Sequence, residues 1–182
     1  MYRSLLVSGY KPHELGVFQE KHDQLPFVKE ALKEKILAQI EAYAVEWIVI
    51  SGQAGVELWA GEQTVQLRQE GWPVQLAVLA PFFEQEERFP EAVKALYEHV
   101  TSEADYMDYI TRRPYDSPQQ LRQKNEFLVT KTDAMLLLYD EEQEGTPRFY
   151  QQAAERRSDY PIIYMTPEDI EDSIRSRMDD WN

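Results

Sequence analysis

Short apolar runs alternate with amphipathic stretches along this chain of 182 residues. The runs are rich in Ile, Val and Leu, which is typical of buried strands. The stretches between them place apolar residues at helical spacing, as in Val28, Leu32, Ile36 and Ile40. The expected strands are residues 4–8, 47–50, 74–79, 104–110, 134–139 and 161–165.

Helix signals separate these strands. Ser117-Pro118 has the order of an N-cap and a first helical residue, and Gln120 stands where a capping box needs it. A long loop, residues 10–26, precedes the first helix, and loops of this length are often functional or disordered. The expected helices cover residues 27–44, 56–70 and 91–100, and three more follow Ser117, Thr146 and Thr166.

Strands and helices alternate about six times, which predicts an α/β fold. We expect a single Rossmann-like, doubly wound domain over residues 1–182, with a mostly parallel sheet of about six strands flanked by helices. The run 134–139 is apolar throughout, which fits a strand buried on both faces. Ligands of this fold class bind beyond the carboxyl ends of the strands, at the switch point where the strand order reverses.

The formal net charge of −14 at pH 7 limits the kinds of binding partner that we expect. Nucleic-acid binding draws its affinity from clustered Lys and Arg, so a chain this acidic is not expected to bind nucleic acid. The absence of cysteine excludes disulfides and thiolate metal sites and is compatible with a cytoplasmic location. No apolar run is long enough to cross a bilayer and no signal peptide is visible, so we expect no membrane insertion.

The turn after the second strand, Ile-Ser-Gly-Gln-Ala-Gly-Val-Glu at 50–57, is the strongest candidate site. A strand, a glycine turn and a helix N-terminus bind anions, because unpaired N–H groups and the positive end of the helix dipole meet there. We expect Ser51, Gly52 and Gly55 to contact a phosphate, with the N–H groups of residues 52–57 facing an open crevice. The alternative is an ordinary turn that binds nothing, since the spacing is neither a dinucleotide fingerprint nor a P-loop.

Polar residues near this turn suggest further contacts. Glu57 can cap the helix, accept hydrogen bonds from a ribose, or act as a general base. Gly9, after the first strand, would offer a backbone N–H to a phosphate, and Arg113 and Lys124 would pair with it, although both can also be surface residues. Asn125 lies on a packing face of its helix and therefore requires a buried partner.

Aromatic residues and a second turn complete the set of candidates. Tyr10, Trp59 and Phe82 are candidates for stacking on a base, with core packing as the alternative. Glu144-Gly145-Thr146 would form a second phosphate-facing turn. The three histidines have no metal-ligand spacing, so we expect no metal site and no Ser-His-Asp triad.

The turn at 50–57 resembles the strand–turn–helix signature of the DprA-like, or SLOG, superfamily of Rossmann-like nucleotide-binding proteins, whose usual form is Ser-Gly-x-Ala-x-Gly-Ile-Asp. Several segments together resemble the YpsA family within it, and this resemblance spans essentially the whole chain. The segments are 8–12, 14–16, 55–59, 113–115, 123–125 and 136–140.

The resemblance implies a cytoplasmic bacterial protein that binds a nucleotide or a nucleotide derivative such as NAD or ADP-ribose, as a sensor or regulator with a link to cell division in some bacteria. The DNA binding of DprA is not expected here, because the charge is −14 and Lys124 replaces an Arg. One alternative is an enzyme that hydrolyses an N-glycosidic or phosphate bond with Glu57 as acid/base, but the phosphoribohydrolase motif Pro-Gly-Gly-x-Gly-Thr-x-x-Glu is absent. Another is an interaction protein with a vestigial pocket, for which a protein partner or a homo-oligomer is expected.

Overall fold

A computed structural model of the chain describes residues 1–16 and 22–181. Six strands form one sheet in the order β4-β3-β2-β1-β5-β6, and every neighbouring pair is parallel. Each expected strand is present, with ends that differ by at most two residues. The strands are β1 Ser4–Gly9, β2 Trp47–Ile50, β3 Gln75–Ala80, β4 Tyr106–Tyr109, β5 Ala134–Leu138 and β6 Ile162–Met165.

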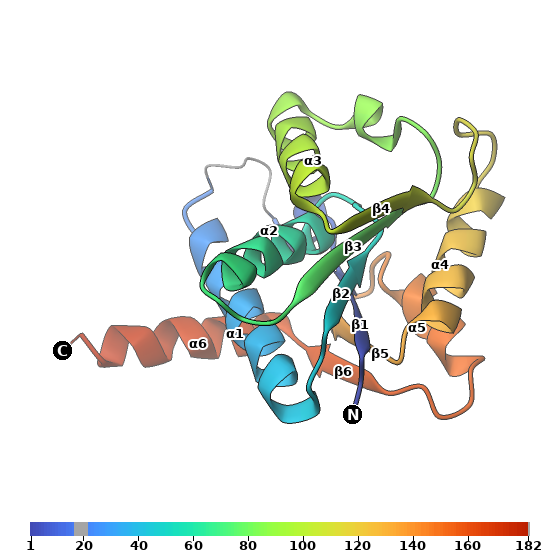
Figure 1. Ribbon diagram of the computed structural model, residues 1–182. Coiled ribbons are helices and arrows are strands. Elements are labelled where there is room, and N and C mark those ends of the chain that lie inside the picture. Colours follow the sequence, from blue (N-terminus) through green and yellow to red (C-terminus); the bar gives the residue numbers. More distant parts are fainter. Residues whose placement is uncertain (17–21, 182) are drawn as a thin grey trace.

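Helices cover both faces of the sheet, which confirms the Rossmann-like α/β fold (Figure 1). α1, α2, α3 and α6 lie on one face, and α4 and α5 pack together on the other (Figure 1). In the described ranges, no helix combines the length and the apolar character that a bilayer span requires. The helices are α1 Leu25–Tyr43, α2 Val56–Gln69, α3 Glu91–Glu103, α4 Gln119–Lys131, α5 Arg148–Glu155 and α6 Pro167–Asp179.

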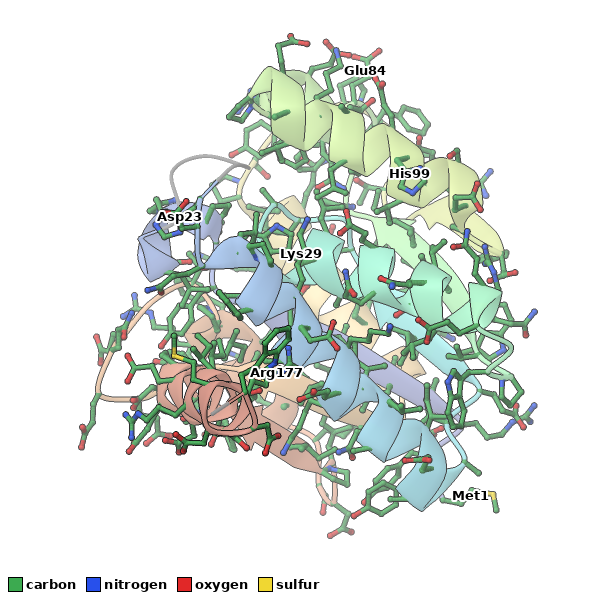
Figure 2. The ribbon with its side chains drawn as sticks, turned by 90° about the vertical axis from the view of Figure 1, so that its left-hand side faces the viewer. Met1, Asp23, Lys29, Glu84, His99 and Arg177 are labelled. Atoms are coloured by element: carbon green, nitrogen blue, oxygen red, sulfur yellow. The ribbon has the colours of Figure 1, made fainter. Side chains whose placement is uncertain are left out.

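Charged pairs tie the larger helical layer together, and Figure 2 looks onto this layer. Lys29 of α1 lies 3.0 Å from Glu62 of α2. Arg177 of α6 pairs with Glu34 of α1, which holds the last helix across the first one (Figure 2). These pairs are partly exposed, so each contributes little to stability.

The strand order reverses beside β1, which pairs with both β2 and β5. Leu5, Leu6 and Val7 are fully buried, and all residues of β5 are buried, because helices cover both sides of these two strands. The carboxyl ends of β1 and β5 therefore mark the switch point of the fold.

Two local expectations need correction. α4 begins at Gln119 with Pro118 as its N-cap, one residue later than the expected cap at Ser117. The Gln120 side chain still accepts from the N–H groups of Ser117 and Asp116 at 3.2 and 2.6 Å, and the first of these bonds is the one that the expected capping box needs. Part of the expected loop at 10–26 is a 3-10 helix, Pro12–Leu15, and α1 already begins at Leu25. Residues 17–21 of that loop lie outside the described residues.

Candidate functional site

A cleft of about 750 Å³ opens at the carboxyl ends of β1, β2 and β3. Its walls come from the segments that follow these strands, from the 3-10 helix Gln85–Arg88, from the start of α3 and from α4. Phe82, Phe89 and Leu121 make much of the wall apolar. The cleft lies on the β2–β3 side of the switch point, whereas we expected it at the switch point itself.

The charge of this cleft is opposite to that of the protein. Lys11, His13, Arg88 and Lys124 line it, and no Asp or Glu is found among the described lining residues. The whole chain has 33 acidic and only 19 basic residues, so the charge of the cleft lining differs in sign from the net charge of the chain. A cleft with this lining attracts anions locally even though the protein as a whole repels them.

The two glycines of the turn are required by close packing. Gly52 and Gly55 have φ angles of +83° and +95°, which strain any other residue. A Cβ on Gly52 would lie 2.7 Å from the ring of Tyr97, and one on Gly55 would lie 2.5 Å from the carbonyl oxygen of Tyr10. The chain after β1 therefore fills the space that a side chain would need at Gly55.

Part of the turn still has free hydrogen-bond donors. Within residues 1–16 and 22–181, the backbone N–H groups of Gln53 and Ala54 have no acceptor, and both residues line the cleft. The N–H of Val56 instead donates to the carbonyl of Tyr10 at 3.2 Å. The expectation of bare N–H groups over residues 52–57 is therefore wrong at Val56, and the free donors are those just before α2.

Glu57 is a structural residue inside the protein. It is fully buried, and its Oε1 accepts hydrogen bonds from the N–H and the Oγ of Ser51 at 2.6 and 2.7 Å. Its Oε2 accepts from the Oγ of Ser8 at 2.9 Å and from the Tyr150 hydroxyl at 3.2 Å. These bonds join the ends of β1 and β2 to α5, and they leave no room at the carboxylate for a ribose or a substrate.

Lys124 lies at the inner wall of the cleft and is only 3% exposed. Its Nζ lies 4.6 Å from the centre of the Tyr150 ring, and it forms no hydrogen bond or ion pair with any described side chain. Burial lowers the pKa of Lys124 to about 8, although the charge of Glu57 opposes this shift and that of Lys11 adds to it. Lys124 is thus a desolvated cation that forms no ion pair with a described carboxylate, and not the solvated surface residue that was the alternative.

The switch point is closed by the protein's own side chains. Gly9 fits between β5 and α2, where a Cβ would lie 2.8 Å from the Cβ of Leu138. Tyr10 is fully buried, its hydroxyl donates to the carbonyl oxygens of Asp140 or Gln143, and it accepts from the N–H of Asp140. Gly9 and Tyr10 are therefore packing residues, which contradicts their expected roles as phosphate donor and base-stacking ring.

The second expected phosphate turn already holds an anion, the carboxylate of Glu14. This carboxylate accepts from the N–H and the Oγ1 of Thr146 at 2.8 and 2.7 Å, and from the N–H of Lys11 at 2.8 Å. Burial alone would raise the pKa of Glu14, but these hydrogen bonds outweigh it and lower the pKa. A Cβ on Gly145 would lie 2.4 Å from a Glu14 oxygen, so no space remains for a phosphate.

The YpsA family model, described as "YspA SLOG family", matches residues 5–170. The chain belongs to the YpsA family. A UPF0398 protein of Halalkalibacterium halodurans is 47% identical over 170 residues, which are 92% of this chain and 89% of that relative. The UPF0398 protein YpsA of Bacillus subtilis is 44% identical over 169 residues, or 91% and 93% of the two chains. A UPF0398 protein of Bacillus pumilus is 42% identical over 172 residues, or 94% and 92%.

The names of these YpsA-family relatives state no ligand and no reaction. Of the remaining candidates, Phe82 lines the cleft, while Trp59 is buried in the core at 1% exposure and cannot stack on a base. Arg113 and Glu144 are exposed and do not line the cleft. Asn125 lies outside the cleft, and its buried Oδ1 lacks the partner that we expected in the described structure.

Sequence reasoning missed several residues of this YpsA-family site. Lys11 and Glu14 follow the first strand, so their position at the binding edge of the sheet was a usable signal. Tyr150 gave no such signal, because it resembles an ordinary core residue of an amphipathic helix and meets Glu57 from 93 positions away. The Nε2 of Gln85 donates to the carbonyl of Ser51 at 2.7 Å. No sequence signal indicated this contact, because Gln85 stands in an acidic loop. No group of three His, Cys, Asp or Glu suited to a metal occurs among the described residues.

Proposed function

We propose that this YpsA-family protein binds a nucleotide or a nucleotide-derived ligand in the cleft, as a cytoplasmic sensor or regulator. The proposal follows from what the cleft offers chemically. It combines cations, free backbone donors and aromatic walls, and these are the groups that phosphates and bases require.

One observation carries the proposal: the buried ammonium of Lys124 has no anionic partner in the described structure, and it lines the same cleft as the free N–H groups of Gln53 and Ala54. A buried charge without a partner is costly. A phosphate would accept hydrogen bonds from these N–H groups and pair with the ammonium, so its binding would offset that cost. The N-terminus of α2 adds partial positive charge at the same place.

The rest of the cleft suits the organic part of such a ligand. Phe82 and Phe89 provide aromatic surface, and Leu121 adds an aliphatic side chain. A volume of about 750 Å³ is in the usual range for small-molecule sites. Arg88, held over the ring of Tyr115 at 4.8 Å, adds a cation near this wall.

Binding without fast turnover is favoured by the position of the carboxylates. Hydrolysis of an N-glycosidic bond generally needs a carboxylate or a comparable acid/base group at the reacting atoms. Glu57 is enclosed by four hydrogen bonds, and no other carboxylate lines the described part of the cleft. This supports a role in ligand sensing over one in catalysis.

The test is a thermal-shift screen followed by calorimetry with AMP, ADP, NAD and ADP-ribose. A ligand at one hundred times its Kd should stabilise the fold by about 2.7 kcal/mol, which corresponds to a shift of several degrees in Tm. Lys124→Met should weaken binding at least tenfold, since it removes a buried charge pair with the phosphate. Lys131→Met, on the exposed end of the same helix, is the matched control and should bind normally. Equal binding by Lys124→Met would overturn the proposal.

The regulatory role has its own test in a bacterium that carries this gene. If ligand binding drives the regulation, a chromosomal Lys124→Met variant should behave like a deletion strain, at unchanged protein level. A variant that binds no ligand and still supports normal growth and division would show that the cleft is vestigial.

A further inference from the structure

A second hollow, of about 470 Å³, lies between α4 and α5. α4 contributes Arg122 and Asn125 to it, and α5 contributes Phe149 and Ala153. Leu121, which is 40% exposed, lines both this hollow and the main cleft. The two cavities are therefore neighbours, separated by one side chain at the beginning of α4.

The second hollow contains polar groups without partners. Arg122 forms no ion pair with any described residue, whereas Arg156 on the opposite wall is held by Glu126 at 3.0 Å. The Oδ1 of Asn125 is buried and has no hydrogen-bond partner in the described structure. The oxygen is enclosed, so a ligand in the hollow would meet this amide at its NH₂ group, which can donate to an acceptor atom of a base.

The hollow also offers a surface for a ring. Phe149 is 47% exposed and lines the hollow, and the guanidinium of Arg148 lies 4.9 Å from the centre of its ring. Arg122 and the amide of Asn125 line the same hollow, as does Glu126, which is paired with Arg156. A planar base with hydrogen-bonding groups at its edge fits this lining. These are the same kinds of group that the main cleft offers, repeated on the other side of Leu121.

We propose that the cleft and the hollow are two halves of one site for an extended, dinucleotide-type ligand. This extension rests on the proposed function of the cleft. The phosphates lie at Lys124, one ring system lies in the main cleft, and the second ring system passes Leu121 and lies beside Phe149 with an acceptor atom toward the NH₂ group of Asn125.

The helical geometry of α4 supports this path. Leu121 and Lys124 are three residues apart and face the cleft together, and Arg122 and Asn125 form the adjacent stripe. A ligand that reaches both stripes must extend by roughly 10 Å, the diameter of a helix with its side chains. Two nucleosides joined through a diphosphate span this distance, while a mononucleotide occupies only one side.

Calorimetry on the full chain with AMP, ADP, NAD and ADP-ribose tests the two halves separately. NAD should bind at least about tenfold more tightly than AMP and ADP, and ADP-ribose, which lacks the second base, should not share this advantage. Arg122→Gln, at an exposed position that should not affect folding, should remove this advantage and leave the Kd of AMP and ADP within about twofold of wild type. Asn125→Leu should act in the same way, and Arg175→Gln on α6 should change nothing.

The outcomes separate this extension from the proposed function. Equal Kd values for mononucleotides and dinucleotides, or an equal loss of both in Arg122→Gln, would show that the hollow is not part of the site. In that case, weaker binding by Lys124→Met would still support the function proposed for the cleft. Binding of none of the four probes, or binding that Lys124→Met leaves intact, would overturn both.

Discussion

The ammonium of Lys124 lies 4.6 Å from the centre of the Tyr150 ring, and no carboxylate among the described residues forms an ion pair with it. Tyr150 in turn donates its hydroxyl to the buried Glu57 at 3.2 Å. Burial, followed by the charge of Glu57, raises the pKa of Tyr150 far above its ordinary value, so this hydroxyl keeps its proton. The Tyr150 side chain thus contacts both Lys124 and the buried carboxylate of Glu57, and Lys124 lines the cleft.

This arrangement predicts a pH dependence of stability. The folded pKa of Lys124 is about 8 and its ordinary value is 10.5, so between these values the unfolded chain binds more protons at this lysine. The free energy of unfolding should therefore rise with pH across that window, by about 2 to 3 kcal/mol. Urea denaturation at pH 7.5 and 10 should show this rise relative to Lys124→Met, while Lys131→Met should follow wild type. Parallel pH dependences of wild type and Lys124→Met would contradict the prediction.

Glu57→Gln should destabilise the fold although the two side chains have nearly the same shape. Gln keeps one acceptor oxygen, and its NH₂ group would face hydroxyl or N–H donors of Ser8, Ser51 or Tyr150 without accepting from them. We expect a loss of about 2 to 3 kcal/mol in the free energy of unfolding, measured by urea denaturation. Glu155→Gln, at an exposed end of α5, should stay within about 0.5 kcal/mol of wild type. An equally stable Glu57→Gln protein would refute a structural role for this carboxylate.

Gly55→Ala should be more destabilising than Gly71→Ala. Both glycines have φ close to +100°, so alanine is strained at either position, by at least about 1 kcal/mol. Only at Gly55 would the added Cβ meet the backbone, 2.5 Å from the carbonyl of Tyr10, whereas nothing lies within 4 Å at Gly71. The difference in denaturation free energy between the variants, expected to exceed about 1 kcal/mol, measures this clash. Two variants of equal stability would show that the turn can move away from Tyr10.

Glu14 should stabilise the protein only while it is ionised. Its folded pKa lies below the ordinary value of 4.5, so its contribution is complete above that value and is lost as the pH falls through the folded pKa. Glu14→Gln should therefore lower the free energy of unfolding by about 1 kcal/mol at pH 7 and have a much smaller effect near pH 3. Thermal denaturation across this range is the measurement. A difference between the two proteins that stays constant with pH would assign the effect to packing alone.

Most secondary structure could be predicted from the sequence because its signals are local. The apolar run 134–139 and the helical spacing of Val28, Leu32 and Ile36 need only neighbouring residues to be interpreted. The strand order could not be obtained in this way. It depends on which strands pair, and β1 pairs with β5 from about 130 positions away in the chain. The position of the cleft relative to the switch point therefore also could not be predicted from local sequence.

The sequence by itself determined that a strand, a glycine turn and a helix occur at residues 47–69, because only glycine adopts the two positive φ angles there without strain. Tertiary structure decided which groups of this motif remain free. The N–H of Ser51 donates to the carboxylate of Glu57. The N–H of Thr146 donates to the carboxylate of Glu14, which lies 132 positions away in the chain. Lys124, whose surroundings come from other helices and strands, keeps an unpaired charge. A hydrogen bond joins whichever groups the fold brings within about 3 Å, and local sequence does not specify that distance.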